Sequence, residues 1–336
     1  MSRSSEGRST GNLGLDPWRC SLEDFRSADP GMARCLERAR VASQTDLPIL
    51  ILGESGTGKT LLARAIHNSS RRADRPFVSF SGAALSDTLL DSQLFGHERG
   101  AFTGAEQRLK GKFELADGGT LFIDEIADMS PLAQAKILRA VEYGEFERLG
   151  SERLQVADVR LLSATHFPLR RFLDSDQFRK DLFYRINGLT LTIAPLRDRP
   201  RDLPALVAAK IAASAGRDGK TITGLSSEAA DMLFNYRWPG NLRELDRVIH
   251  AAVAMTTGSI IGAEAVMLEG EWTSDPPAPP TRGGGAAIDD ANLKAMERRH
   301  VRRVLERLGG NKARAARALG ISRSTLDRKL AARASS

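Results

Sequence analysis

Four short apolar runs stand out along the first half of the chain. They are Pro48–Leu52, Pro76–Phe80, Gly118–Glu125 and Val159–His166, the last two ending in polar residues. Short runs that are apolar almost throughout are typical of strands buried on both faces. Apolar residues at helical spacing, as in Met32–Ala42, lie between or before these runs. Strands that alternate with helices in this way predict a parallel sheet with helices on both faces, an α/β fold.

The second half of the chain has a different pattern. From Leu196 to about Val266 it is rich in Ala and Leu, with helical spacing and few strand signals, which predicts a small helical lid. Prolines and then glycines between Glu271 and Ala287 predict a linker. The last residues again have helical spacing. We therefore expect five parts: a flexible leader at 1–29, an α/β subdomain at 30–195, the lid at 196–268, the linker at 269–288 and a small all-α domain at 289–336.

A glycine-rich segment joins the first apolar run to a helical segment. It reads Gly53-Glu54-Ser55-Gly56-Thr57-Gly58-Lys59-Thr60 and matches the phosphate-loop pattern G-x-x-x-x-G-K-[ST]. The glycines let the backbone wrap around a phosphate chain, and the loop N–H groups and the helix N-terminus then face the anion. We expect Lys59 to reach the β- and γ-phosphates and the Thr60 hydroxyl to bind Mg²⁺. A glycine-rich turn without a ligand is the alternative, and the strand and helix on either side disfavour it.

Two adjacent acids, Asp124 and Glu125, close the third apolar run. In an open parallel sheet, ligands bind at the carboxyl ends of the strands. We therefore expect Asp124 to orient Mg²⁺ or its water, and Glu125 to act as a general base on the attacking water. An acidic strand end that only faces solvent is the alternative. At the end of the fourth run, Thr165 or His166 could contact the γ-phosphate or the attacking water, or only cap the strand.

Three arginines are candidates for phosphate contacts, because the planar guanidinium donates two hydrogen bonds at once. Arg179 and Arg185 lie near one face of a predicted short helix, and Arg243 follows the turn Trp238-Pro239-Gly240 in the predicted lid, aimed back at the nucleotide. Arginines on a helix surface are more often plain solvated charges, so the residue types leave both interpretations open.

Between the second and third apolar runs the chain makes an excursion that suits neither a core helix nor a core strand. It includes Gly100-Ala101-Phe102-Thr103-Gly104-Ala105 and closes at Gly111–Ala116. We expect this loop to be an excursion that projects from the fold. In the alternative interpretation, Phe102 tucks into the core, as a lone Phe usually does.

Positive charge is concentrated near the C-terminus. Residues 288–336 hold 13 Lys and Arg against 5 Asp and Glu, a formal charge of +8, whereas the whole chain carries +7; the other 287 residues therefore sum to −1. Within this part, a turn at Gly320-Ile321 separates one helical segment from a basic one that Ser322 caps, a pattern typical of a helix-turn-helix. A helical bundle that is merely basic is the alternative. We predict that the last helix lies in the major groove of DNA, with contacts from Ser322, Arg323, Ser324, Thr325, Arg328 and Lys329.

Composition excludes several other classes of protein. Hydrophobic residues make up 41% and charged residues 27%, as in ordinary globular proteins, and no apolar run reaches the ~18 residues of a membrane span. Two cysteines, Cys20 and Cys35, are too few for a disulfide framework or a metal site, and the N-terminal residues lack the apolar core of a signal peptide. We expect a protein of the reducing cytoplasm.

Taken together, the motifs resemble those of bacterial enhancer-binding proteins, activators of sigma-54 RNA polymerase that are built on an AAA+ ATPase. The resemblance rests on Gly53–Thr60, Phe95–Ala105, Gly118–Glu125 and Trp238–Leu245. The hexapeptide Gly100–Ala105 is the most specific element, because other AAA+ branches lack it. The segment from Gly310 to Leu326 resembles the Fis-type DNA-binding domain usual in this family, so that the resemblance covers about residues 30–333.

This resemblance implies ATP and Mg²⁺ as cofactors and a role for each candidate residue. Lys59 and Thr60 would bind phosphate and Mg²⁺, Asp124 and Glu125 would form the Walker B pair, and Arg243 would be the sensor arginine of the lid. Arg179 and Arg185 would be arginine fingers that act on ATP held by the neighbouring subunit of a ring, typically a hexamer. Phe102 and Thr103 would lie at the tip of the excursion, where an exposed Phe102 would be an apolar anchor for sigma-54, so that hydrolysis remodels the closed promoter complex and DNA can melt.

Four positions depart from the family pattern. Thr60 stands where the family more often has Glu, and His166 replaces a common Asn. Ser81 stands where an Asn usually holds the catalytic glutamate in check, and the shorter Ser leaves that coupling open. Asp327 sits where the DNA-binding helix often has Tyr, and an acid there would repel phosphate.

Control and function carry further expectations. The leader of about 30 residues cannot house the receiver or ligand-sensing domain common in the family, so we expect control by a protein partner in trans or by expression level. The partners implied are sigma-54 polymerase, enhancer DNA and further copies of the chain, including a dimer through the C-terminal domain. The alternatives are a DNA-binding regulator with weak or uncoupled ATPase, and a DNA-remodelling AAA+ motor. The hexapeptide argues against both.

Overall fold

The computed structural model describes residues 19–82, 86–167, 169, 177–268, 312, 316 and 326. The chain divides into two compact units, Met1–Glu269 and Gly270–Ser336. The first unit holds the α/β part and the lid. In the second unit, Lys312, Ala316 and Leu326 are helical, and Ala316 and Leu326 are buried.

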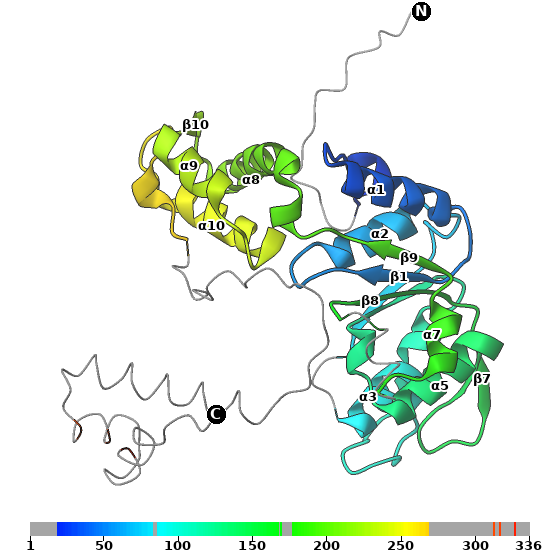
Figure 1. Ribbon diagram of the computed structural model, residues 1–336. Coiled ribbons are helices and arrows are strands. Elements are labelled where there is room, and N and C mark those ends of the chain that lie inside the picture. Colours follow the sequence, from blue (N-terminus) through cyan, green and yellow to red (C-terminus); the bar gives the residue numbers. More distant parts are fainter. Residues whose placement is uncertain are drawn as a thin grey trace, which may run out of the picture. The chain divides into compact units, whose positions relative to one another are not determined.

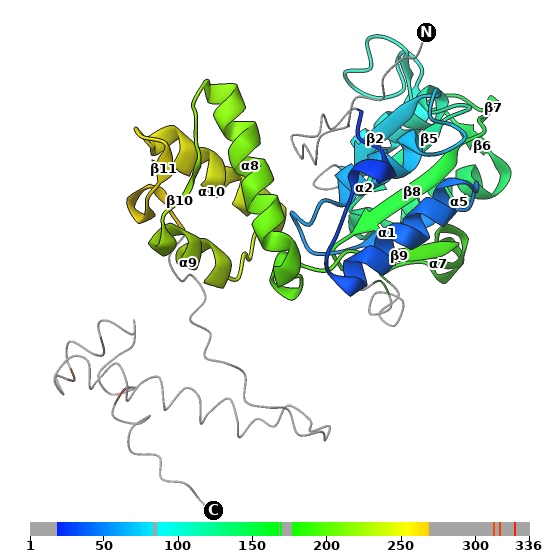
Figure 2. The same cartoon turned by 90° about the horizontal axis from the view of Figure 1, so that it is seen from above.

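A five-stranded parallel sheet forms the centre of the α/β part (Figures 1 and 2). Its order is β2-β5-β8-β1-β9. The strands are β1 (Ile49–Leu52), β2 (Phe77–Ser81), β5 (Thr120–Asp124), β8 (Arg160–Thr165) and β9 (Leu189–Thr192). Four of these are the apolar runs of the sequence. The fifth, β9, alternates Leu and Thr at the edge of the sheet, where one neighbouring strand is enough.

Helices cover both faces of the sheet, because successive residues of a strand point to opposite sides. On one face, Ile49 and Ile51 pack with α1 (Pro30–Ser43) and α2 (Lys59–Asn68). On the other face, Leu50 belongs to a second core with the helices α3 (Asp87–Phe95), α4 (Lys112–Leu115), α5 (Pro131–Tyr143) and α7 (Lys180–Ile186). Figure 1 shows these two helical layers with the sheet between them. The predicted α/β fold is therefore confirmed.

Residues 20–28 belong to this fold rather than to a flexible leader. Cys20 and Leu22 are only 2% and 1% exposed and pack in the same core as α1 and α2. The short helix η1 (Leu22–Asp24) is tied down by Ser69 Oγ, which accepts a hydrogen bond from the Leu22 N–H at 2.8 Å. Polar residues flank both of them, so the sequence pattern does not predict that Cys20 and Leu22 are buried.

Two small antiparallel hairpins extend the α/β part. The excursion after α3 is closed at its base by β3 (Gly96–His97) and β4 (Leu109–Lys110). A second hairpin consists of β6 (Glu145–Glu147) and β7 (Leu154–Val156). A β-bridge between His97 and Leu149 links the two hairpins. The short helix η2 (Ile126–Asp128) follows β5 directly.

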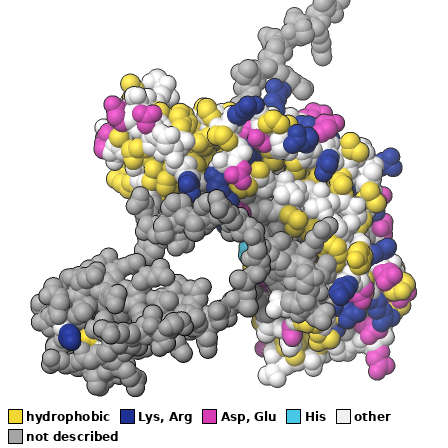
Figure 3. Space-filling view, viewed as in Figure 1, with side chains coloured by type: hydrophobic (Ala, Val, Ile, Leu, Met, Phe, Trp, Pro, Cys, Tyr) yellow, Lys and Arg dark blue, Asp and Glu magenta, His cyan; other side chains and the backbone are white. Residues whose placement is uncertain are grey.

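The lid is built from three helices around its own core. They are α8 (Leu203–Asp218), α9 (Ser227–Asn235) and α10 (Asn241–Met255), together with the short elements β10 (Gly224–Leu225), β11 (Ile260–Ile261), η3 (Leu196–Asp198), η4 (Pro200–Asp202) and η5 (Ala263–Ala265). Trp238, 1% exposed, fills the centre of this core. Hydrophobic side chains also lie on the lid surface (Figure 3), where Met232, Phe234, Met255 and Ile260 are exposed. No helix in the described part of the chain is long and apolar enough to span a membrane.

Candidate nucleotide site

The glycine-rich loop connects β1 to α2 as its pattern predicts. Gly56 and Gly58 have φ values of 78° and 101°, a left-handed conformation that side chains other than glycine rarely adopt. A Cβ at Gly56 would lie only 2.3 Å from the Gly240 carbonyl oxygen of the lid. Thr57 Oγ1 donates to the Glu54 carbonyl oxygen at 2.8 Å and tightens the turn. The N-terminus of α2 therefore opens onto this loop, where its free N–H groups favour an anion.

Lys59 and Thr60, the first residues of α2, reach the ends of the neighbouring strands. Lys59 is only 6% exposed, its Nζ donates to the Gly53 carbonyl oxygen at 3.0 Å, and the same Nζ lies 3.3 Å from Glu125 Oε1. Thr60 Oγ1 lies 3.4 Å from Asp124 Oδ2. The structure thus brings together two pairs of candidates, Lys59 with Thr60 and Asp124 with Glu125, that lie more than 60 residues apart in sequence.

Asp124 and Glu125 stand at the carboxyl end of β5, next to the loop. Burial raises the pKa of Asp124, and the neighbouring charge of Glu125 raises it further. A hydroxyl and a carboxylate side by side offer the hard oxygen ligands that Mg²⁺ prefers, alongside substrate phosphates and water. No group of three or more His, Cys, Asp or Glu able to hold a metal by itself exists among the described residues, so a cation here would also need the phosphates.

Glu125 has both carboxylate oxygens occupied. Oε1 faces Lys59, while Oε2 accepts the main-chain N–H of His166 at 3.1 Å and the His166 Nδ1 at 2.8 Å. Burial alone would raise the pKa of Glu125, but the hydrogen bonds from His166 and the charge of Lys59 outweigh it and hold that pKa below its usual value.

Thr165 and His166 take different places at the end of β8. Thr165 is fully buried; its Oγ1 accepts the Phe167 N–H at 3.1 Å and its carbonyl oxygen accepts the Gly53 N–H at 3.3 Å. It does not line the cavity described below, so its hydroxyl caps the strand. His166 is the residue that reaches Glu125.

The turn before α10 fastens the lid to the phosphate loop. Asn241 is fully buried, and its Nδ2 donates to the Ser55 carbonyl oxygen at 3.1 Å and to Glu54 Oε2 at 3.3 Å. Its Oδ1 accepts the Leu196 N–H at 2.7 Å. Arg243 Nη1 donates to Ser55 Oγ at 2.9 Å, which places the predicted sensor arginine on the phosphate loop.

Glu54 has a second partner from the lid segment. Arg197 forms a two-pronged ion pair with it, at 2.5 and 2.8 Å. This pair lowers the pKa of Glu54. Sequence reasoning missed Arg197 and Asn241, because their function depends on where the lid meets the loop.

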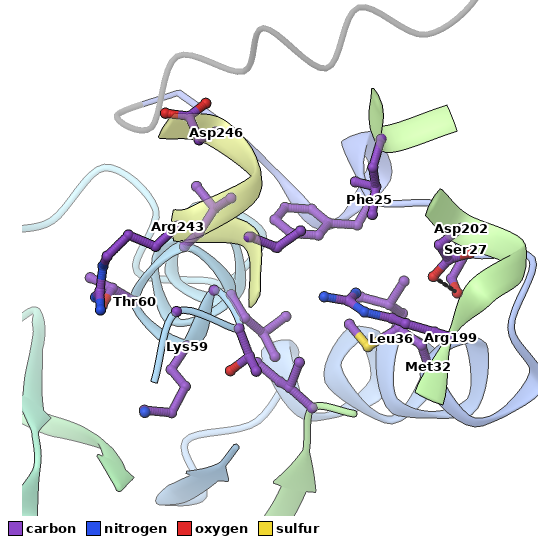
Figure 4. A pocket seen from close by; sticks show the side chains of 18 of the residues that line it. Phe25, Ser27, Met32, Leu36, Lys59, Thr60, Arg199, Asp202, Arg243 and Asp246 are labelled. Carbon is purple, nitrogen blue, oxygen red and sulfur yellow. Dashed lines mark hydrogen bonds between the residues drawn. The ribbon is translucent and has the colours of Figure 1, made fainter. Parts of the chain in front are cut away.

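A cavity of about 900 Å³ lies between the loop, α1 and the lid. Figure 4 shows Lys59, Thr60 and Arg243 at one end of it, and Phe25, Met32, Leu36 and Arg199 toward the other. Arg199 is 5% exposed, and its Nε and Nη2 have no hydrogen-bond partner in the part of the chain that is described. The polar end suits a phosphate chain, and the apolar end with its buried donors suits a base and sugar.

Arg179 and Arg185 do not line this cavity. Arg179 is the N-cap residue of α7 and forms an exposed ion pair with Asp181, whose Oδ2 lies 2.7 Å from Arg179 Nη2. Arg185, in the last turn of α7, donates to the carbonyl oxygens of Val141 and Glu142 at 3.2 and 3.3 Å. Both side chains are exposed, so neither touches the nucleotide site of its own chain.

The hexapeptide Gly100–Ala105 folds into a compact turn beyond β3. The Gly100 N–H donates to the Ala105 carbonyl oxygen at 2.8 Å, and Gly100 and Gly104 have φ values of 82° and 101°. Thr103 is exposed, whereas Phe102 is half-buried, and its ring stands edge-on against His97 with centroids 5.0 Å apart. Phe102 is therefore less exposed than the resemblance implies, because a histidine of the same excursion covers one side of the ring.

The predicted DNA-binding residues lie outside the described residues. They are Ser322, Arg323, Ser324, Thr325, Arg328 and Lys329, and Asp327 lies outside as well.

Comparisons with protein families match three consecutive parts of the chain. Residues 25–192 match the Sigma-54 interaction domain, residues 197–278 the AAA+ ATPase lid domain, and residues 292–332 the Bacterial regulatory protein, Fis family. These matches agree with the sheet-and-lid architecture above and with the helix-turn-helix expected from the basic C-terminal segment.

Curated relatives carry the same parts. The transcriptional regulatory protein ZraR of Klebsiella oxytoca is 45% identical over 301 residues, which are 90% of this chain and 67% of that protein. The Nif-specific regulatory protein of Azotobacter vinelandii is 42% identical over 296 residues, 87% of this chain and 55% of that protein. The chain thus spans about two thirds of the first relative and about half of the second.

Solved structures show the same fold. NtrX from Brucella abortus in complex with ADP has a TM-score of 0.67 at 30% identity, over 92% of this chain and 68% of that one. RuvB from Thermotoga maritima, at 18% identity and a TM-score of 0.51, covers 91% of this chain and 87% of that one and supports the fold alone. With a sigma-54 interaction domain across half of its residues, an AAA+ lid and a Fis-type helix-turn-helix, the chain belongs to the family of sigma-54-dependent transcriptional activators, which are AAA+ ATPases.

Proposed function

We propose that this chain binds ATP in the 900 Å³ cavity and couples its hydrolysis to the remodelling of sigma-54 RNA polymerase from the closed to the open promoter complex. The observation that carries this proposal is the convergence of Lys59, Thr60, Asp124 and Glu125 at one edge of the sheet. The lid turn closes over the same loop, so that one cavity joins all the elements that the chemistry needs.

In this site each residue has a distinct task. Lys59 would leave Gly53 and Glu125 to neutralise the β- and γ-phosphates, while Arg243 would move from Ser55 to the γ-phosphate side. Thr60 and Asp124 would hold Mg²⁺ together with the phosphates, and the bound cation would offset the charge that develops on them. Glu125 would take the proton of the attacking water.

Arg179 and Arg185 would act on a neighbouring copy of the chain. Both are exposed and stand away from their own cavity, which is what a finger supplied in trans requires. Arg179 would exchange Asp181 for the γ-phosphate of the neighbour, a charge-assisted bond in either case. We therefore propose a ring of copies, with a hexamer as the expected size, working in the cytoplasm where polymerase and DNA are.

The hexapeptide would deliver the output of the cycle to sigma-54. Ser81 of β2 lies opposite Asp124 of β5, and from Ser81 the chain runs on through α3 to β3 and the hexapeptide. A shift at the nucleotide site thus has a short path to this loop. Thr103 would be the exposed contact, and Phe102 would supply apolar surface once it leaves His97. DNA would be bound by the six residues predicted from the basic C-terminal segment, which are Ser322, Arg323, Ser324, Thr325, Arg328 and Lys329.

Thr103→Ala tests this assignment. The variant is expected to hydrolyse ATP at the rate of the unchanged chain and to lose open-complex formation with sigma-54 polymerase, because Thr103 lies outside the cavity. Gln107→Ala, which is also exposed and lies just beyond the hexapeptide, is the matched control and is expected to keep both activities. Normal activation by Thr103→Ala would refute the role of the loop.

A further inference from the structure

The carboxylate of Glu125 is held in place from two sides. Lys59 Nζ lies 3.3 Å from Oε1, and His166 directs two donors at Oε2, from its main chain at 3.1 Å and from Nδ1 at 2.8 Å. Because an ionised carboxylate only accepts hydrogen bonds, Nδ1 must carry the hydrogen of this contact. A carboxylate with both oxygens engaged has little capacity left for the proton of a water molecule.

The backbone and the sheet order favour this arrangement. Glu125 has φ and ψ of 51°, a left-handed conformation, at the point where β5 ends. Since β5 and β8 are neighbours, the exits of both strands lie side by side, and His166 follows β8 directly. The His166 ring is itself fixed against Phe167, with ring centroids 3.7 Å apart.

The two restraints respond differently to nucleotide. Lys59 is the phosphate-binding lysine of the loop, so bound ATP would draw it away from Oε1. His166 does not line the cavity, and its contact would persist when ATP binds. Ser81, on the other flank of β5, makes no hydrogen bond with Glu125 in the described part of the chain.

We propose that His166 is a positioning residue that restrains Glu125: its Nδ1–H holds the carboxylate back from the attacking water, so that basal ATP hydrolysis stays slow until the site rearranges. This inference rests on the proposed role of Glu125 as the general base. In this chain the restraint comes from β8, on one side of β5, whereas the short Ser81 leaves the β2 side of β5 without one.

Removal of the imidazole is the first test. For the full chain without polymerase, His166→Ala is expected to raise the kcat of ATP hydrolysis about tenfold, the factor that corresponds to one hydrogen bond of about 1.4 kcal/mol to a charged group. The KM for ATP is expected to stay the same, because the side chain does not line the cavity. A lower or unchanged kcat would overturn the proposal.

Two polar variants separate restraint from a purely structural role. In His166→Asn the amide nitrogen takes the place of Nδ1, one bond beyond Cγ, so kcat is expected to remain at the unchanged value. In His166→Gln the donor lies one methylene further out, and kcat is expected to rise as in His166→Ala. The pair decides the matter even if the alanine variant fails to fold; equal rates for Asn and Gln would contradict the proposal.

A matched control and a second variant complete the design. His250 makes a similar exposed contact with a carboxylate, 3.7 Å from Asp218 in the lid, and His250→Ala is expected to change neither kcat nor KM. Glu125→Ala in the His166→Ala background is expected to abolish turnover. Turnover that survives without Glu125 would refute its role as the base. If the double variant shows no turnover but His166→Ala alone has the kcat of the unchanged chain, only the restraint is refuted.

Discussion

Asn241 is the residue through which the lid and the phosphate loop are most directly joined. Its φ is 53°, and Asn adopts this left-handed conformation more readily than other residues with a side chain. Its Oδ1 satisfies the buried Leu196 N–H, and its Nδ2 spans Ser55 and Glu54. Asn241→Ala therefore combines backbone strain with lost hydrogen bonds.

The magnitude follows from these two contributions. A side chain other than Asn in the left-handed region costs roughly 1 kcal/mol. A buried N–H that loses its acceptor costs roughly 2 kcal/mol, and Leu196 is 1% exposed. Asn241→Ala is thus expected to lower the free energy of unfolding by about 3 kcal/mol, whereas Asn241→Gly, which relieves the strain, is expected to cost about 2 kcal/mol.

Urea unfolding of the full chain measures both values, followed by tryptophan fluorescence, to which Trp238 in the lid core contributes beside Trp18 and Trp272. Asn235→Ala is the matched control, because Asn235 is exposed and its side chain donates to the Asp231 carbonyl oxygen of its own helix. That variant is expected to shift unfolding by less than about 0.5 kcal/mol. An Asn241→Ala midpoint equal to that of the control, or a Gly variant no better than Ala, would refute the reasoning.

Further predictions concern nucleotide, neighbouring copies and pH. Lys59→Ala is expected to abolish binding of a fluorescent ATP analogue, while Glu125→Ala binds it and does not turn over ATP; equal binding by both would contradict the site. Arg179→Ala is expected to lose hydrolysis and to regain it when mixed with Glu125→Ala, because one copy then supplies the finger and the other the base; no recovery on mixing would remove the trans assignment. His67 is buried, and burial lowers its pKa to about 4. Below about pH 6.5 the unfolded chain therefore binds a proton at His67, whereas the native chain leaves this side chain neutral until about pH 4. The free energy of unfolding should therefore fall by roughly 2 kcal/mol between pH 7 and pH 5 on account of His67 alone, and His67→Gln should remove that part of the acid sensitivity in urea titrations.

The central strands of the sheet could be predicted from the sequence because buried strands appear there as short apolar runs. β1, β5 and β8 are covered on both faces, so each contains consecutive buried apolar residues, and the phosphate loop needs glycines for its backbone. The edge strand β9 was missed, since its Thr residues face away from the core and break the apolar run. Cys20 and Leu22 were missed because their burial depends on a partner, α2, that is distant in sequence.

In the site, too, features set by local sequence could be predicted, and contacts between distant segments could not. Spacing and strand ends predicted that Lys59, Thr60, Asp124 and Glu125 share one site, and the structure brings these side chains together, because they belong to one loop and one strand end. The contact of His166 with Glu125 depends on β8 lying beside β5, and sheet order cannot be deduced from the runs alone.

The central claim is that ATP hydrolysis by this chain opens promoters through sigma-54. The most direct measurement is the melting of promoter DNA by sigma-54 polymerase, detected by permanganate reactivity, with the purified chain and either ATP or a non-hydrolysable analogue. Melting is expected with ATP and not with the analogue, and the Glu125→Ala variant is expected to give no melting with ATP. Melting that is equal with the analogue, or absent with ATP although the chain hydrolyses it, would contradict the account.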